Sequence, residues 1–348
     1  MAHRASNPAR SLTARARVLY ASVPVASRKK PQSVGSAPTA VKRPAPAKAA
    51  PATAAPVKPA PPKPAPPDSD PSTFRVRFWG VRGSIPGPGP DTVEIGGNTS
   101  CVEVRCGKAV IIFDAGTGLR LLGNSLMREM PLTTHLFFSH VHWDHIQGFP
   151  FFTPAFVRGN KIFMYGGKNV SGTVETALAG QMEMPNFPVH LTHLPAALSF
   201  NDLDEGEVVE IEGGVRVSNS SGNHPGGVYA YRVDYQGKSV VYCTDSEHYS
   251  IPDPKIVALA KNADVLIFDT MYTPEEYEGK TGGPPKTGWG HSHFVAGVEL
   301  VKKAGIKKYV LTHHDPGQTD AMVHEKVRRT RELFPNSLAA YEGLVLDL

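Results

Sequence analysis

The chain has 348 residues, enough for one large domain or two ordinary ones, and a formal net charge of +5. That charge comes from residues 1–67, which contain twelve Lys and Arg and no Asp or Glu, whereas residues 68–348 hold 25 basic and 32 acidic residues. The high isoelectric point is therefore no evidence for a basic binding face on the folded part. No stretch has the ~18–20 apolar residues that span a bilayer, and no apolar secretory segment is present.

The N-terminal region has a composition that cannot bury a core. Residues 31–67 are mostly Pro, Ala and Lys, which favour extended polyproline II. We predict a disordered, basic tail over residues 1–70 and a folded domain over residues 71–348. The tail is interpreted as a semi-rigid tether. There are two alternatives. Residues 1–30 could be an organelle transit peptide, or the tail could be weakly attracted to nucleic acid, an anionic membrane or another acidic partner.

Cysteine usage indicates the compartment. Cys101, Cys106 and Cys243 are odd in number and have no CxxC spacing. We expect buried free thiols and a reducing compartment, the cytoplasm.

From residue 74 onward, short strands come in groups that are interrupted by single helices. Alternating or continuous apolar patterns predict strands over 74–81, 101–106, 109–116, 134–140, 161–166, 207–211, 215–221, 228–235, 238–245, 264–272, 307–314 and 344–348. Helical spacing predicts helices over 117–130, 171–182, 292–305 and 319–334. The strands with continuous apolar runs need cover on both faces. A sandwich of two sheets with helices outside each sheet satisfies this need.

A dense group of metal-binding side chains follows the strand at 134–140. The segment "SHVHWDH", residues 139–145, contains His140, His142, Asp144 and His145. Strand alternation places His140 and His142 on one side, with Asp144 and His145 at the turn. Because four ligands so close in sequence cannot easily surround one ion, we predict two ions.

Further ligands follow other strands. His224, Asp245 and His313 each come after an apolar strand pattern, where loops carry chemistry. The first ion would have His140, His142, His224 and Asp245; the second would have Asp144, His145, Asp245 and His313. All are nitrogen or oxygen ligands, which suit Zn²⁺, Mn²⁺ or Fe. We predict Zn²⁺, with Mn²⁺ or Fe as alternatives.

The segment "HVHWDH" resembles the HxHxDH motif of the metallo-β-lactamase superfamily. The resemblance covers residues 74–348 and implies an αββα four-layer sandwich, an α/β (α+β) fold, preceded by the tail. Residues 223–248 are similar to the corresponding segment in the ribonuclease Z and phosphoribosyl cyclic phosphodiesterase branch. "GWGHSH", residues 288–293, also resembles that branch, which implies a proton-donating role for His291, with His293 as the alternative. Asp114 resembles an early Asp of the superfamily that orients a ligand or the turn beneath the metals.

The resemblance implies a metal-dependent hydrolase. We expect a phosphodiesterase in which Asp144 serves as a catalytic ligand and a hydroxide shared by two divalent ions attacks a small, cyclic nucleotide or sugar phosphodiester. Ribonuclease Z carries a long arm between the residues corresponding to His224 and Asp245, which here are only 21 positions apart. We therefore expect no transfer RNA. A lactone or thioester hydrolase, and a metal-binding regulatory protein that acts through its tail, are the alternatives; a homodimer is left open.

Overall fold

The structure is a computed structural model that describes residues 70, 72–168 and 170–348. Almost all of the predicted tail, with the proposed transit peptide and tether, lies outside the described residues. Along the described part of the chain, no helix has both the length and the apolar character needed to cross a membrane.

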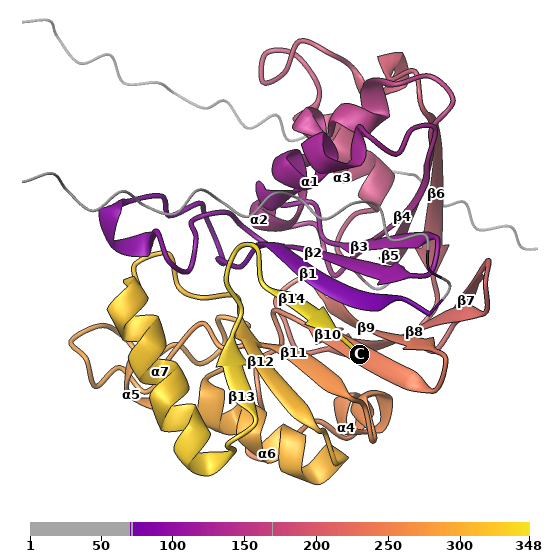
Figure 1. Cartoon of the computed structure of the whole chain (residues 1–348). Helices are drawn as coiled ribbons and strands as arrows, with labels where there is room; N and C mark the ends of the chain where they lie inside the picture. The colour runs from indigo at the N-terminus through magenta and orange to yellow at the C-terminus, as the bar shows by residue number, and fades with distance from the viewer. Residues whose placement is uncertain (1–69, 71, 169) are drawn as a thin grey trace, which may run out of the picture. The chain divides into compact units, whose positions relative to one another are not determined.

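Two seven-stranded sheets form the centre of the fold (Figure 1). In order across the first sheet, the strands are β14 (Val345–Asp347), β1 (Phe74–Gly80), β2 (Cys101–Cys106), β3 (Ala109–Phe113), β4 (Thr133–Phe138), β5 (Lys161–Gly167) and β6 (Ala197–Leu203). In order across the second sheet, they are β13 (Ser337–Ala339), β12 (Lys308–Thr312), β11 (Val265–Asp269), β10 (Lys238–Cys243), β9 (Val228–Tyr235), β8 (Val215–Gly222) and β7 (Val208–Ile211). The C-terminal strand β14 returns to pair with β1.

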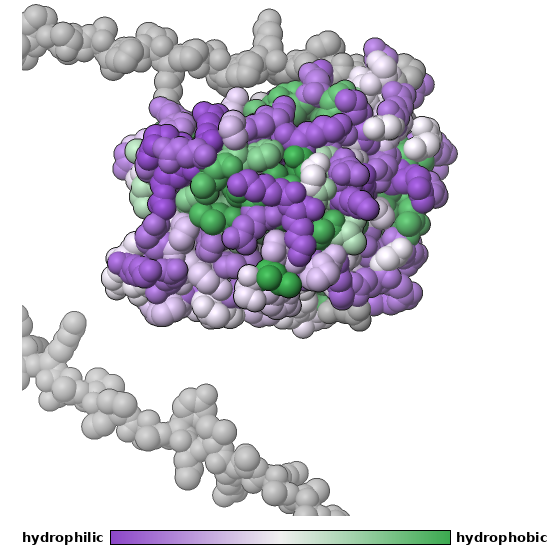
Figure 2. Space-filling view, turned by 90° about the horizontal axis from the view of Figure 1, so that it is seen from below, coloured by the Kyte–Doolittle hydropathy of each residue, from purple (hydrophilic) through white to green (hydrophobic). Residues whose placement is uncertain are grey.

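Helices cover the outer faces of both sheets (Figure 1). The helices are α1 (Gly118–Leu126), α2 (Trp143–Ile146), α3 (Val174–Gln181), α4 (Pro254–Ala260), α5 (Pro274–Tyr277), α6 (Phe294–Ala304) and α7 (Asp320–Leu333). Short 3-10 turns are η1 (Pro90–Thr92), η2 (Phe149–Phe151), η3 (Thr153–Phe156) and η4 (Leu191–His193). Figure 2 shows the lower face of the molecule, where hydrophilic side chains surround smaller apolar areas.

The apolar side chains form three layers, as a sandwich with outer helices requires. One layer lies between the sheets and includes Phe78, Phe113 and Tyr231. A second packs α1 and α3 against the first sheet, and a third packs α4, α6 and α7 against the second sheet. The predicted αββα sandwich is confirmed.

The sequence patterns located most elements but missed short or polar ones. Strands β6 and β13 and helices α2, α4 and α5 were not predicted: β6 is only partly buried, β13 has three residues, and α2 and α5 have four each. Helix α6 begins at Phe294, two residues later than predicted, and ends at Ala304, followed by Gly305, whose φ of 72° suits a glycine C-cap. The three cysteines are buried and free, as expected.

Candidate metal centre

The candidate ligands gather where neighbouring parallel strands end. In the first sheet β3 and β4 are parallel, and Asp114 and His140 follow their last residues. In the second sheet β10, β11 and β12 are parallel, with Asp245 and His313 after β10 and β12. Asp114, Asp245 and His313 have φ values of 60°, 49° and 57°. Non-glycine residues rarely adopt this left-handed conformation, and such residues cluster at functional sites.

The first group contains His140, His142 and His224. Each offers a ring nitrogen, and these nitrogens lie within 4.8 Å of one another. His224 Nε2 is 3.1 Å from His142 Nδ1. The Oδ2 atom of Asp245 lies 3.8 Å from His140 Nε2 and 3.9 Å from His224 Nε2. The structure therefore brings together the four residues predicted for the first ion.

The second group contains Asp144, His145, Asp245 and His313, all buried. His145 Nε2 lies 3.0 Å from Asp144 Oδ2 and 3.3 Å from Asp245 Oδ1. His313 Nε2 lies 3.2 Å from Asp144 Oδ2 and 3.1 Å from Asp245 Oδ1. Asp245 thus directs Oδ1 toward the second group and Oδ2 toward the first, as a bridging carboxylate would.

The chemistry of these residues fits divalent cations. Among the described residues, the buried Nε2 atom of His140 has no hydrogen-bond partner, a costly state unless another group binds it. Burial holds the pKa of His140 well below its usual range, so the ring stays neutral, the form that binds a metal. Burial also disfavours the charged form of His145, but Asp144, Asp245 and Asp114 outweigh it and raise its pKa well above the usual value. A site that attracts a proton so strongly also attracts a metal cation.

Residues beneath the metal ligands fix their orientation. Asp114 accepts a hydrogen bond from His145 Nδ1 at 2.8 Å, from Ser139 N at 2.8 Å and from the Tyr242 hydroxyl at 2.7 Å. The Ser139 hydroxyl donates to Asp114 and can therefore accept from His140 Nδ1, 3.1 Å away. Both rings consequently present Nε2 to the site. The predicted orienting role of Asp114 agrees with these contacts.

The loop before α6 supports the first group from the other side. His224 Nδ1 donates to the Gly290 carbonyl at 2.9 Å, which leaves Nε2 for a ligand. Glu247 holds this loop, because its carboxylate accepts from Gly288 N at 2.8 Å, from Gly290 N at 2.9 Å and from the Tyr277 hydroxyl at 2.6 Å.

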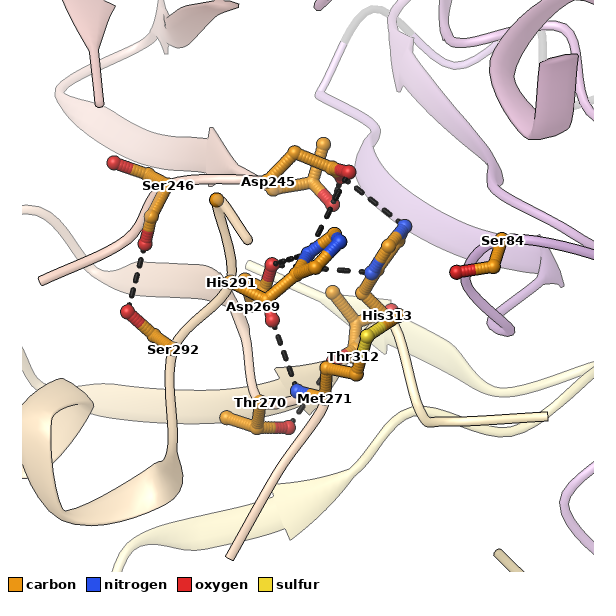
Figure 3. Close-up of polar contacts among 12 residues, drawn as sticks. Ser84, Asp245, Ser246, Asp269, Thr270, Met271, His291, Ser292, Thr312 and His313 are labelled. Carbon is orange, nitrogen blue, oxygen red and sulfur yellow. Dashed lines mark hydrogen bonds and ion pairs between the residues drawn. The ribbon is translucent and has the colours of Figure 1, made fainter. Parts of the chain in front are cut away.

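His291 points from this loop toward Asp245 and Asp269 (Figure 3). Its Nδ1 donates to Asp269 Oδ2 at 2.8 Å and lies 3.7 Å from Asp245 Oδ2. Burial disfavours the imidazolium, but the charge and hydrogen bond of Asp269 outweigh it and raise the pKa of His291 to about 9. His291 lies outside the helix, which begins at Phe294, so the helix terminus is not the controlling influence.

The alternative donor, His293, has a different environment. It is the N-cap of α6, and its Nδ1 accepts from Ala296 N at 3.1 Å. Burial, with His248 nearby, lowers its pKa to about 4, so at neutral pH it is not the imidazolium that a general acid requires. The geometry favours His291 over His293.

Two carboxylates of the site were not identified from the sequence. Neither Asp269 nor Glu247 is among the metal ligands and proton donors predicted from the sequence, yet both are buried. Asp269 could have been found by the rule that located its neighbours, since it ends β11 between the strands that precede Asp245 and His313. Nothing in the local sequence around Glu247 indicates its role.

A four-layer αββα sandwich with histidine and carboxylate clusters at the strand ends defines a class of metal-dependent hydrolases. The family described as "Beta-lactamase superfamily domain" matches residues 110–314. The chain belongs to this metallo-β-lactamase superfamily, and the curated relatives that it resembles include several ribonucleases Z.

Individual relatives agree with this placement. A ribonuclease Z of Leuconostoc mesenteroides is 24% identical over 69% of this chain and 87% of its own length. Among solved structures, the metallo-β-lactamase fold protein YhfI of Bacillus subtilis matches with a TM-score of 0.58 and 18% identity over 80% of this chain and 100% of its own. Human tRNase Z, short form, matches with a TM-score of 0.54 and 19% identity over 78% of this chain and 98% of its own.

The expectation that transfer RNA is no partner of this chain is wrong. It rested on the short segment between His224 and Asp245, which β9 and β10 fill. That segment excludes one long arm but says nothing about other surfaces that could hold an RNA. The relatives named ribonuclease Z and tRNase Z contradict the exclusion.

Proposed function

We propose that this chain is a dinuclear metal-dependent phosphodiesterase. The observation that carries the proposal is Asp245, whose two oxygens face two separate ligand groups. His140, His142 and His224 would hold one ion with Asp245, and Asp144, His145 and His313 would hold the other with the same carboxylate. Zn²⁺ is the favoured metal because the set is rich in histidine. Two such ions would activate water and neutralise charge on the phosphoryl oxygens.

The protein side chains would divide the remaining work. His291 would donate a proton from Nε2 to the leaving oxygen, since its Nδ1 is bound to Asp269. Ser84 N donates to Asp144 Oδ2 at 2.8 Å and fixes that carboxylate. An alkoxide is a stronger base than a thiolate and needs a proton donor more when it leaves. The presence of a candidate donor, His291, therefore favours a phosphodiester over a thioester as the substrate.

We propose a small nucleotide or sugar phosphodiester, with a cyclic one as first choice, as the substrate. A cleft of about 510 Å³, lined by Ser84, His142, Asp144, Asp245 and His291 among others, has a volume suited to a small ligand. A transfer-RNA precursor is the second candidate, favoured by the relatives named ribonuclease Z and tRNase Z.

The test is metal analysis of the full chain, followed by assays of bis-p-nitrophenyl phosphate, 2′,3′-cyclic AMP, 3′,5′-cyclic AMP, a transfer-RNA precursor, a lactone and a thioester. We expect two metal ions per chain and turnover of phosphodiesters above the lactone and thioester. Two bound metals with no phosphodiester turnover would overturn the proposal. Faster cleavage of the RNA precursor than of every small phosphodiester would establish the second candidate.

A further inference from the structure

Two tryptophans are exposed to solvent beside the metal centre. Trp143 is 75% exposed and lines the cleft that contains Asp144, Asp245 and His291. Trp289 is 50% exposed on the loop that carries His291. An indole left in water does not contribute the favourable free energy of its burial to folding. Exposed aromatic groups beside a site therefore indicate a binding surface.

Both indoles project from rigid backbone. Trp143 is the first residue of α2, whose turn is closed by His145 N donating to the His142 carbonyl at 3.0 Å and by Gln147 N donating to the Trp143 carbonyl at 2.8 Å. Trp289 stands between Gly288 and Gly290, whose backbone N–H groups both donate to Glu247. A pre-positioned ring binds a planar partner with little loss of conformational entropy.

Both tryptophans are next in sequence to residues of, or in contact with, the first ligand group. His142, next to Trp143, contacts His224 at 3.1 Å, and His224 contacts the Gly290 carbonyl, next to Trp289, at 2.9 Å. The Lys286 ammonium lies 4.0 Å above the centre of the Trp289 ring. The Trp143 indole therefore lies at the cleft, and the loop that carries His291 adds a second exposed indole with a positive charge beside it.

Resting on the proposed function, we propose that Trp143 and the Lys286–Trp289 pair, both exposed beside the metal centre, bind the bases of a nucleotide phosphodiester. Nucleobases stack on aromatic side chains with about 1–3 kcal/mol per base, and the ammonium offsets phosphate charge. A sugar phosphate without a base has no planar group for these rings. The surface formed by Trp143, Lys286 and Trp289 thus selects nucleotides among the possible phosphodiester substrates.

The test compares two substrates with the same leaving group, thymidine 5′-p-nitrophenyl phosphate and methyl p-nitrophenyl phosphate. We expect Trp143→Ala and Trp289→Ala to raise KM for the thymidine compound at least about fivefold more than KM for the methyl compound. Trp143→Phe and Trp289→Phe, which keep an aromatic ring, should restore most of the preference. An equal change with both substrates would overturn the inference.

A binding measurement separates this inference from the proposed function. In the holoprotein, 5′-AMP should quench indole fluorescence more than ribose 5-phosphate does, and Trp143→Phe with Trp289→Phe should remove that quenching. Trp79 is buried and bonded to Glu103, so it supplies a constant background. No difference between the two ligands would overturn the inference. If 5′-AMP quenches the fluorescence but no phosphodiester is turned over, the proposed phosphodiesterase function would be wrong, and the inference that the two tryptophans bind nucleotides would still hold.

Discussion

His291 combines burial, a carboxylate partner and proximity to Asp245 without belonging to either histidine-containing ligand set proposed for the two ions. We expect His291→Ala to lower kcat by about 10²–10⁴-fold, the usual contribution of a positioned acid, with metal content unchanged. Inductively coupled plasma analysis beside steady-state kinetics checks this. Loss of one metal ion in the variant would instead assign His291 to the ligands, as its place near Asp245, Asp269 and His313 would allow.

Asp269 sets the protonation of His291. Because the carboxylate raises the pKa of His291 to about 9, a protonated donor persists through neutral pH and is lost as the pH rises through that value. Asp269→Asn removes the charge and lowers the pKa, so the alkaline fall in kcat should begin at lower pH. The pH–rate profile of the two proteins measures this. A uniform loss of rate with an unmoved alkaline limb would show that Asp269 acts only on structure.

At the scale of elements, the loop from Lys286 to His293 depends on one carboxylate. Glu247 binds two of its backbone N–H groups, and the same loop carries the carbonyl that orients His224. We expect Glu247→Gln to lower kcat about tenfold or more, since charge-assisted hydrogen bonds are worth about 1.5–3 kcal/mol. Glu299→Gln is the matched control and should behave as wild type, because Glu299 is exposed and lines a second pocket together with Glu247.

Strand ends explain how far the sequence could predict this site. His140, Asp245 and His313 were found because apolar runs mark their strands, and chemistry gathers after such runs. Asp269 obeys the same rule, but its role was not predicted, since that role depends on His291, which lies 22 positions away on a loop. Glu247 could not be predicted, since its partners are backbone N–H groups of residues 288 and 290, which no side-chain pattern reveals. The sandwich was predictable because burial on both faces leaves continuous apolar runs.

For the whole molecule, one buried lysine couples stability to pH. Lys326 of α7 is 1% exposed and donates to the Thr270 carbonyl at 2.5 Å and to Gln318 Oε1 at 2.7 Å. Burial lowers its pKa to about 7, although Glu276 and Asp269 partly oppose this. The unfolded chain, with the ordinary pKa near 10.5, then binds more protons than the folded chain between about pH 7 and 10. The contribution of Lys326 to the free energy of unfolding therefore rises with pH between about pH 7 and 10.

We expect Lys326→Met to remove this rise. Urea unfolding at pH 6.5, 8 and 9.5 should show wild type gaining stability relative to the variant as the pH increases. Lys303→Met, an exposed lysine near the end of α6, should show no such difference from wild type. A constant gap between wild type and Lys326→Met at all three values would contradict the buried-lysine account.

The division of the ligands between the two sheets has a consequence for fragments of the chain. His140, His142, Asp144 and His145 lie before the turn that joins β6 to β7, and His224, Asp245 and His313 lie after it. That turn contains the exposed residues Asp204 and Glu205, and β14 crosses back to pair with β1. Two polypeptides divided at this turn would hold four and three of the candidate ligands, and neither would complete the proposed centre alone. When co-expressed, the two polypeptides should bind metal and hydrolyse substrate only after they reassociate. The same division could therefore report the association of two proteins fused to the two polypeptides.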